Sequence, residues 1–224
     1  MNRRALLLFA SMGVVWGFPY LLIRVSVRYL SPATLVCART AVAAAMLLPL
    51  AAIRGDLRPL LARWRPLAAY TLIEVSIPWL LLSDAERRLS SSLSGLLVAA
   101  VPLIGAVLVM IVGGEDRVDR RRMSGLVVGL VGVGVLLGFN VSAADLPSVG
   151  EVGLVAVGYA VGPMIAARKL HDSPTLGVVA VSLVITAVIY APFALTGLPA
   201  AVPPGRVLLA VGALGVVCTA FAFM

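Results

Sequence analysis

Charge is scarce in this 224-residue chain, and so are the residue types that build metal centres. Charged residues make up 12% of the sequence, and there are two cysteines and one histidine. Cys37 and Cys218 lie in separate apolar runs, which argues against a disulfide framework or a thiolate metal site and favours small packing residues. His171 has no other metal-ligating residues clustered around it. We therefore expect no metal and no cofactor, and the lack of a Ser/His or paired-Asp arrangement argues against an enzyme.

Apolar residues dominate what remains. They account for 61% of the chain, and the mean hydropathy is +1.07, whereas soluble domains are about 45–50% apolar. The net charge of +8 would suit a nucleic-acid-binding protein. However, the arginines form short clusters between apolar runs and do not line one face. We therefore expect a protein that contacts the lipid bilayer and no nucleic acid.

Eight apolar runs approach, with their flanking small residues, the roughly 20 residues that span a bilayer. Backbone polar groups in lipid must be satisfied within each segment, so these runs should be helices. The predicted fold class is an all-α polytopic membrane protein. The predicted spans are residues 5–23, 33–53, 66–83, 93–112, 126–137, 149–167 and 175–195, with an eighth beginning at 207.

Positive charge is distributed unevenly between the two sides of these spans. With the N-terminus inside, twelve arginine and lysine residues fall on the cytoplasmic side and five on the outer side, which is the bias of the positive-inside rule. Four of the twelve belong to the stretch 115–122, which we expect to be a solvated turn. The sequence thus predicts a multi-pass protein of the cytoplasmic (inner) membrane with a cytoplasmic N-terminus.

Proline positions recur in the two halves of the chain. Pro19 and Pro163 are 144 residues apart, and Pro49 and Pro192 are 143 apart. A near-constant offset with five spans per copy predicts an inverted repeat, a feature of secondary transporters. Residues 1–145 would form the first five-helix unit and 146–224 an incomplete second one, with about eight of ten expected helices present. Either the chain is a fragment, which we favour, or another chain supplies the partner surface.

Several short motifs carry a family resemblance. They are the GVVWG segment at 13–17, Arg39, residues 91–102, Gly114-Glu115 and Gly125. In this order and spacing they resemble the EamA family of the drug/metabolite transporter superfamily, over almost the whole chain. The resemblance implies ten helices in two inverted five-helix repeats around a central cavity that opens alternately to each side. It also implies export of small metabolites, amino acids or drugs.

Glu74 stands in the middle of the third span with no charged neighbour in sequence. A carboxylate at bilayer depth is costly unless it is paired, protonated or facing water, so it is a functional candidate. At ~1.5 Å per residue, Arg39 lies about 11 Å and Glu74 about 13 Å from the outer ends of their spans, which predicts a salt bridge. A purely structural pair is the alternative. If Glu74 is functional, it either binds a cationic group of the substrate or carries a coupling proton.

Aromatic and hydroxyl side chains extend this candidate site. Rings in the first, third and sixth spans could stack on a substrate or contact a cation, although anchoring at the membrane interface also fits Tyr20 and Trp79. Ser94 offers a hydroxyl near the outer end of the fourth span, where close packing of small residues explains it equally well. The predicted substrate-binding residues are Trp16, Tyr20, Arg39, Glu74, Trp79, Ser94 and Tyr159.

Four prolines, Pro19, Pro78, Pro102 and Pro163, are predicted to interrupt the first, third, fourth and sixth spans. Each is either a simple kink or part of a set that marks the cavity-facing helices. Together with the resemblance, these features predict a secondary transporter that exports or exchanges a small metabolite, amino acid or drug by alternating access. The alternative is a non-transporting membrane subunit, or a truncated fragment, that only assembles with other helices. A homodimer is compatible with either.

Overall fold

The structure, a computed structural model, describes residues 3–112 and 120–223, and every regular element in these ranges is a helix. The predicted all-α class is therefore confirmed. Most of the charged stretch 115–122, together with the motif residues Gly114 and Glu115, lies outside the described residues.

The helices follow one another with short connections. In the first part of the chain they are α1 (Arg3–Ser26), α2 (Pro32–Ile53), α3 (Arg58–Leu61), α4 (Trp64–Tyr70), the π-helix η1 (Thr71–Ser76), α5 (Ile77–Ala85), α6 (Ser91–Val98), α7 (Val101–Val112) and α8 (Arg120–Asn140). After these come the 3₁₀-helix η2 (Ala143–Asp145), α9 (Leu146–Lys169), α10 (Thr175–Thr196), α11 (Gly205–Gly215), the π-helix η3 (Val216–Ala220) and the 3₁₀-helix η4 (Phe221–Phe223).

Five helical stretches are long and apolar enough to cross a membrane: Pro32–Ile53, Trp64–Ala85, Ser91–Ile111, Ala143–Lys169 and Thr175–Thr196. They coincide with the predicted second, third, fourth, sixth and seventh spans. The predicted fifth and eighth spans coincide with the shorter apolar stretches Met123–Val135 and Gly205–Ala220. The predicted first span lies within the 24-residue α1. The chain is thus a multi-pass helical membrane protein.

Serine residues mark the starts of two of these helices. Ser31 precedes α2, and its Oγ accepts a hydrogen bond from the backbone N–H of Thr34 at 3.1 Å. Ser90 precedes α6 and accepts in the same way from the N–H of Leu93 at 3.2 Å. Both side chains satisfy an N–H group that the first helical turn leaves without a partner.

The four prolines predicted to interrupt spans differ in effect. The fourth span does break, because α6 ends at Val98 and α7 begins at Val101, one residue before Pro102. Pro78 follows directly on the π-helix η1, at the start of α5. Pro19 and Pro163, by contrast, lie inside the continuous helices α1 and α9. For these two the predicted interruption is wrong, since the remaining hydrogen bonds of a long helix carry it past the one that proline removes.

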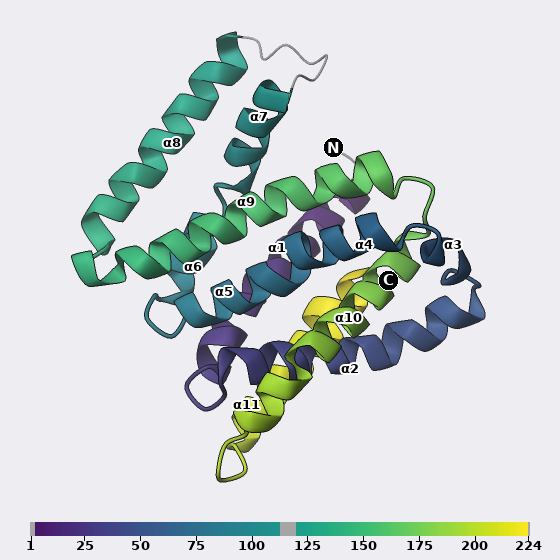
Figure 1. Ribbon diagram of the computed structural model, residues 1–224. Helices are drawn as coiled ribbons and strands as arrows, with labels where there is room; N and C mark the ends of the chain where they lie inside the picture. Colours follow the sequence, from purple (N-terminus) through teal and green to yellow (C-terminus); the bar gives the residue numbers. More distant parts are fainter. Residues whose placement is uncertain (1–2, 113–119, 224) are drawn as a thin grey trace.

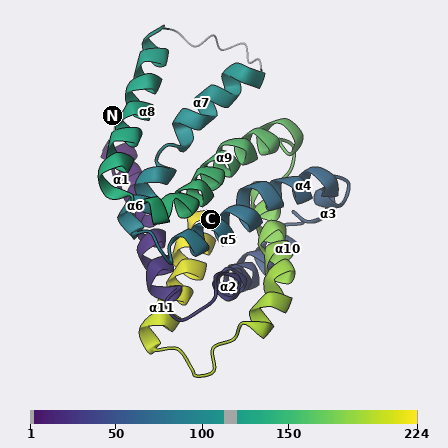
Figure 2. The same cartoon turned by 60° about the vertical axis from the view of Figure 1, so that its left-hand side comes forward.

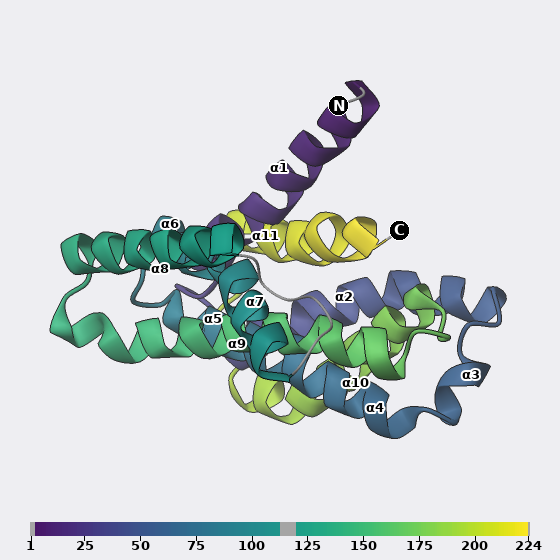
Figure 3. The ribbon, with the colours of Figure 1, turned by 90° about the horizontal axis from the view of Figure 1, so that it is seen from above.

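The helices pack as antiparallel neighbours around three apolar cores. α2 and α10 lie side by side along their length, as both views show (Figures 1 and 2). Ala43 and Leu47 of α2 meet Ala180 and Leu183 of α10 in one core. α9 covers α5 and η1, whereas α1 packs against α11 and its N-terminal part projects from the bundle (Figure 3). α7 and α8 stand at one side (Figure 1).

Corresponding helices of the two parts share several local features. α1 and α9 each contain 24 residues, and α2 and α10 each contain 22. Pro49 and Pro192 each lie four residues before the end of their helix. The π-helices η1 and η3 begin at Thr71 and Val216, an offset of 145 residues close to that of the prolines. The division into units 1–145 and 146–224 stays a prediction.

Candidate functional site

Glu74 lies in the π-helix η1 and faces α9. The side chain is half-buried, and its Oε2 is buried without a hydrogen-bond partner among the described residues. Gly162 of α9 lies directly against it: a Cβ placed on Gly162 would overlap the carboxylate and come within 2.7 Å of the Glu74 Cβ. A π-helical turn is wider than an α-helical one and is common at functional sites. Here the π-helical turn holds the Glu74 carboxylate against α9 at Gly162, a position without a side chain.

Arg39 is buried in α2, with 5% of its surface exposed. Its guanidinium carbon lies 3.8 Å from the centre of the Trp79 ring, within cation–π range. One terminal nitrogen donates to Thr219 Oγ1 of the second π-helix, η3, at 3.2 Å. The Nε has no hydrogen-bond partner within the described part of the chain. Arg39 therefore joins α2 to both α5 and η3 and keeps one donor unused.

The predicted salt bridge between Arg39 and Glu74 does not form. Across residues 3–112 and 120–223, the ion pairs lie at exposed positions: Arg63–Asp172 at 3.0 Å, Arg87–Asp84 at 3.2 Å and His171–Asp172 at 3.0 Å. Depth along the span was estimated from the sequence, but the direction of each side chain around its helix was not. Arg39 points towards Trp79 and η3, whereas Glu74 points towards α9.

Tyr159 of α9 lies within electrostatic range of Arg39, Tyr20 and Glu74 and close to Trp79. The predicted residues Tyr20, Arg39, Glu74, Trp79 and Tyr159 thus form one cluster, called the polar cluster below. It draws on α1, α2, η1, α5 and α9.

The other two predicted residues lie differently. Ser94 is fully buried in α6, and its Oγ has no hydrogen-bond partner among the residues described. It precedes Gly95, where an added Cβ would be in van der Waals contact with the Tyr20 ring at 3.4 Å. Trp16 is 60% exposed on α1. A role for Trp16 in binding stays a prediction.

Glu86 was missed from the sequence, because it falls between the predicted third and fourth spans. The residue is fully buried, and neither carboxylate oxygen has a hydrogen-bond partner within the described ranges. The guanidinium of Arg24 donates to its backbone carbonyl. A signal was present: Leu82, Glu86 and Leu89 recur at helical spacing, and all three are buried on one face.

Hydroxyl contacts between η1 and α10 were also missed. Thr71 donates to Ser182 Oγ at 2.8 Å, and Ser76 and Thr186 share a hydrogen bond of 2.7 Å. The Tyr190 hydroxyl donates to the Ser76 carbonyl at 3.0 Å. These bonds occupy polar groups of the π-helix, whose presence the hydropathy pattern does not reveal. They fix η1, and with it Glu74, against α10.

Comparison with known proteins identifies the family to which the chain belongs. The EamA-like transporter family matches residues 3–138, which is more than half of the chain. The chain belongs to this family. One solved structure, titled only "Crystal structure of protein", has a TM-score of 0.73 at 22% identity, with 99% of this chain and 78% of that chain covered. It supports the fold alone. No curated protein matches the chain significantly.

Membership of the EamA-like transporter family makes the chain a membrane transporter of small molecules. The family consists of transporters and not of enzymes, in agreement with the prediction from the sequence. The small-molecule substrate and the lipid bilayer are accordingly its expected partners.

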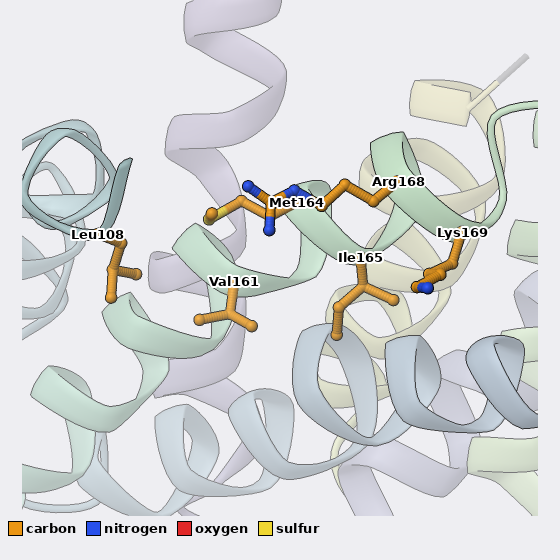
Figure 4. A pocket seen from close by; sticks show the side chains of 6 residues that line it. All are labelled: Leu108, Val161, Met164, Ile165, Arg168 and Lys169. Atoms are coloured by element: carbon orange, nitrogen blue, oxygen red, sulfur yellow. The ribbon is translucent and has the colours of Figure 1, made fainter. Parts of the chain in front are cut away.

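A hollow of about 310 Å³ in this EamA-like chain lies between α7 and α9, away from the polar cluster. Leu108 of α7 and Val161, Met164 and Ile165 of α9 form its apolar wall, and Figure 4 shows Arg168 and Lys169 at one end. A second hollow of about 300 Å³ runs along α1 beside Gly13 and Gly17. Neither contains a residue of the predicted binding set.

Proposed function

We propose that this EamA-like chain exports or exchanges a small organic solute across the cytoplasmic membrane by alternating access, and that the polar cluster lies on the solute's path. The polar cluster itself is the observation that carries the proposal. A buried guanidinium, a carboxylate and three aromatic rings converge from five helical elements inside the bundle. Polar groups at bilayer depth are costly and are retained mainly where they serve function.

The repeated features of the two parts support the alternating-access element of the proposal. Residues 1–145 and 146–224 would form two inverted copies, with the polar cluster at their junction. Arg39 belongs to the first copy and contacts Thr219 of the second. Glu74 belongs to the first copy and contacts Gly162 of the second. A rocking motion of one copy against the other would change both contacts.

Within the polar cluster, Arg39 and Glu74 take different parts. The free Nε of Arg39 offers a donor to an anionic or carbonyl group of the solute, while Trp79 holds the guanidinium in place. Glu74 offers an acceptor to a cationic group, beside the Tyr159 ring, or carries a coupling proton. Tyr20, Trp16 and Ser94 complete the proposed binding set.

The proposed orientation places the N-terminus in the cytoplasm. The exposed Arg63, which donates to the Lys169 carbonyl at 2.7 Å and pairs with Asp172, would lie at the cytoplasmic face. This arrangement follows the positive-inside rule. A homodimer is compatible with it and is tested by the mass of the purified protein in detergent.

Counterflow in proteoliposomes tests the proposed function. Vesicles preloaded with a pool of metabolites, amino acids and cationic drugs are expected to exchange at least one labelled member of the pool. Glu74→Gln, which keeps the size of the side chain, should reduce that exchange at least tenfold, whereas Asp172→Asn, at an exposed pair, should leave it unchanged. A folded protein that exchanges no solute would contradict the proposal and favour a non-transporting membrane subunit.

A further inference from the structure

Glu86 is the C-cap residue directly after α5 and is the most enclosed carboxylate among the described residues for which burial is given. Its exposed fraction is 0%, and both carboxylate oxygens lack a hydrogen-bond partner in the described structure. Leu82 and Leu89 bury the same helical face. The site therefore excludes solvent and leaves no volume for an organic solute.

Two arginines lie near Glu86 without pairing with its carboxylate. Arg24 uses a guanidinium N–H to bind the backbone carbonyl, which anchors the main chain and leaves the side chain free. Arg39 interacts electrostatically with Glu86 but forms no ion pair with it, and keeps its Nε unused. The helices packed around Glu86 carry further titratable or charged residues towards this end of the bundle. From the neighbouring helices these include Tyr20 and Arg24 of α1, Arg39 of α2, and Glu151 and Tyr159 of α9. From its own helix end they are Asp84, Arg87 and Arg88.

A carboxylate without a partner in a dry interior is strongly disfavoured as an ion and is stable as the neutral acid. A proton occupies no volume of its own, so a site too small for a solute can hold one, although exchange of that proton requires water or another acceptor to reach the carboxyl group. Arg24 and Arg39 would both stabilise the ionised form, and Arg39 is the one whose buried Nε–H donor is unused.

We propose that Glu86 is the proton-carrying residue of this transporter: it holds a proton in the arrangement described here and, after releasing it, turns to pair with Arg39. In the release step a rearrangement opens the leucine-sealed site to water from the outer side; the carboxyl O–H bond breaks, the proton passes to that water, and the carboxylate remains. Recapture reverses the step. Because Arg39 also stacks on Trp79, the new pair would draw on a member of the polar cluster and couple the proton to the solute. This inference rests on the proposed transport function.

The fully buried position also distinguishes Glu86 from Glu74. Glu74 is half-buried, and its carboxylate fills the space beside Gly162 on α9. Part of the Glu74 side chain is thus exposed and can meet a solute group, whereas Glu86 is sealed by leucines. The structure assigns the proton to Glu86 and leaves Glu74 to the solute.

Infrared difference spectroscopy of the purified protein without solute tests the proton directly. A carbonyl band of a neutral carboxylic acid should be present at neutral pH and disappear reversibly as the pH is raised. Glu86→Gln should remove the band, and Glu86→Asp should shift it, which gives an answer even if the glutamine variant does not fold. Asp84→Asn, two residues away at an exposed pair, should leave it in place. A band unchanged in both Glu86 variants would overturn the inference.

Transport measurements separate this inference from the proposed function. In proteoliposomes, Glu86→Gln should keep the rate of solute exchange within about twofold of the wild type. The accumulation of solute driven by a pH gradient should fall at least tenfold relative to the wild type. Asp84→Asn should keep both. Equal pH-driven accumulation in wild type and Glu86→Gln would contradict the assignment while leaving transport itself standing. If the wild type exchanges no solute, the transport proposal fails, and the infrared result alone decides whether Glu86 holds the proton.

Discussion

The contact between Glu74 and Gly162 allows a direct test of the close packing of α9 against η1. In Gly162→Ala the new Cβ would overlap the carboxylate and lie 2.7 Å from the Glu74 Cβ and 2.8 Å from its Cδ. The carboxylate end can rotate away, but the Glu74 Cβ is fixed to the backbone, so α9 and η1 must separate by several tenths of an ångström. Overpacking of this kind typically costs about 1–3 kcal/mol.

Thermal unfolding in detergent measures this cost. For a chain of this size, 1 kcal/mol corresponds to roughly 2–4 °C in Tm, so Gly162→Ala should lower Tm by roughly 2–12 °C. The matched control is Gly153→Ala on the same helix, where a Cβ meets nothing within 4 Å. That substitution should be neutral or raise stability by up to about 1 kcal/mol, because alanine is the better helix former.

A double mutant shows whether Glu74 is the cause. Glu74→Ala removes the carboxylate and the Cδ while keeping the Cβ, so it should relieve part of the Gly162→Ala penalty, a coupling detectable in a double-mutant cycle. Equal Tm values for Gly162→Ala and Gly153→Ala would refute the predicted packing of Glu74 against α9. Strict additivity in the cycle would place the strain elsewhere.

Three further substitutions test single contacts by thermal unfolding. Arg39→Lys should lose about 0.5–2 kcal/mol, because the compact ammonium replaces a planar guanidinium stacked on Trp79; equal stability would show that the stacking contributes nothing. Ser31→Ala removes the cap on the Thr34 N–H and should cost about 1 kcal/mol, and a loss below about 0.3 kcal/mol would contradict the cap. Tyr190→Phe removes the hydroxyl bond to the η1 carbonyl and should cost about 0.5–1.5 kcal/mol, whereas a gain in stability would speak against that bond.

The spans were predictable because lipid imposes one strong rule on the chain. Backbone groups in the hydrocarbon layer need partners within their own segment, so hydropathy locates the helices with little help from tertiary structure. The break at Pro102 was predictable for a related reason, since proline is well tolerated in the first turn of a new helix. The continuity of α1 through Pro19 and of α9 through Pro163 was not predictable, because it depends on the hydrogen bonds of the surrounding helical turns.

The partners of the buried charges were less predictable. Depth follows from residue number at a fixed rise, so Arg39 and Glu74 were placed at similar heights. The direction in which a side chain points around its helix depends on local backbone geometry. The π-helix η1 changes this direction for Glu74, and no residue pattern in the third span predicts a π-helix there. The burial of Glu86 was readable from helical spacing with Leu82 and Leu89. The neighbouring Asp84, Arg87 and Arg88 concealed it by suggesting a solvated turn.

Cys218 offers the most direct test of alternating access at the polar cluster. Both cysteines are free thiols, and Cys218 in η3 precedes Thr219, whose hydroxyl accepts a hydrogen bond from Arg39. In a Cys37→Ala variant, a membrane-impermeant thiol reagent should modify Cys218 when added to either side of the membrane, in right-side-out and in inside-out vesicles. A transported solute should slow both reactions. Modification from one side only, or from neither, would contradict the account.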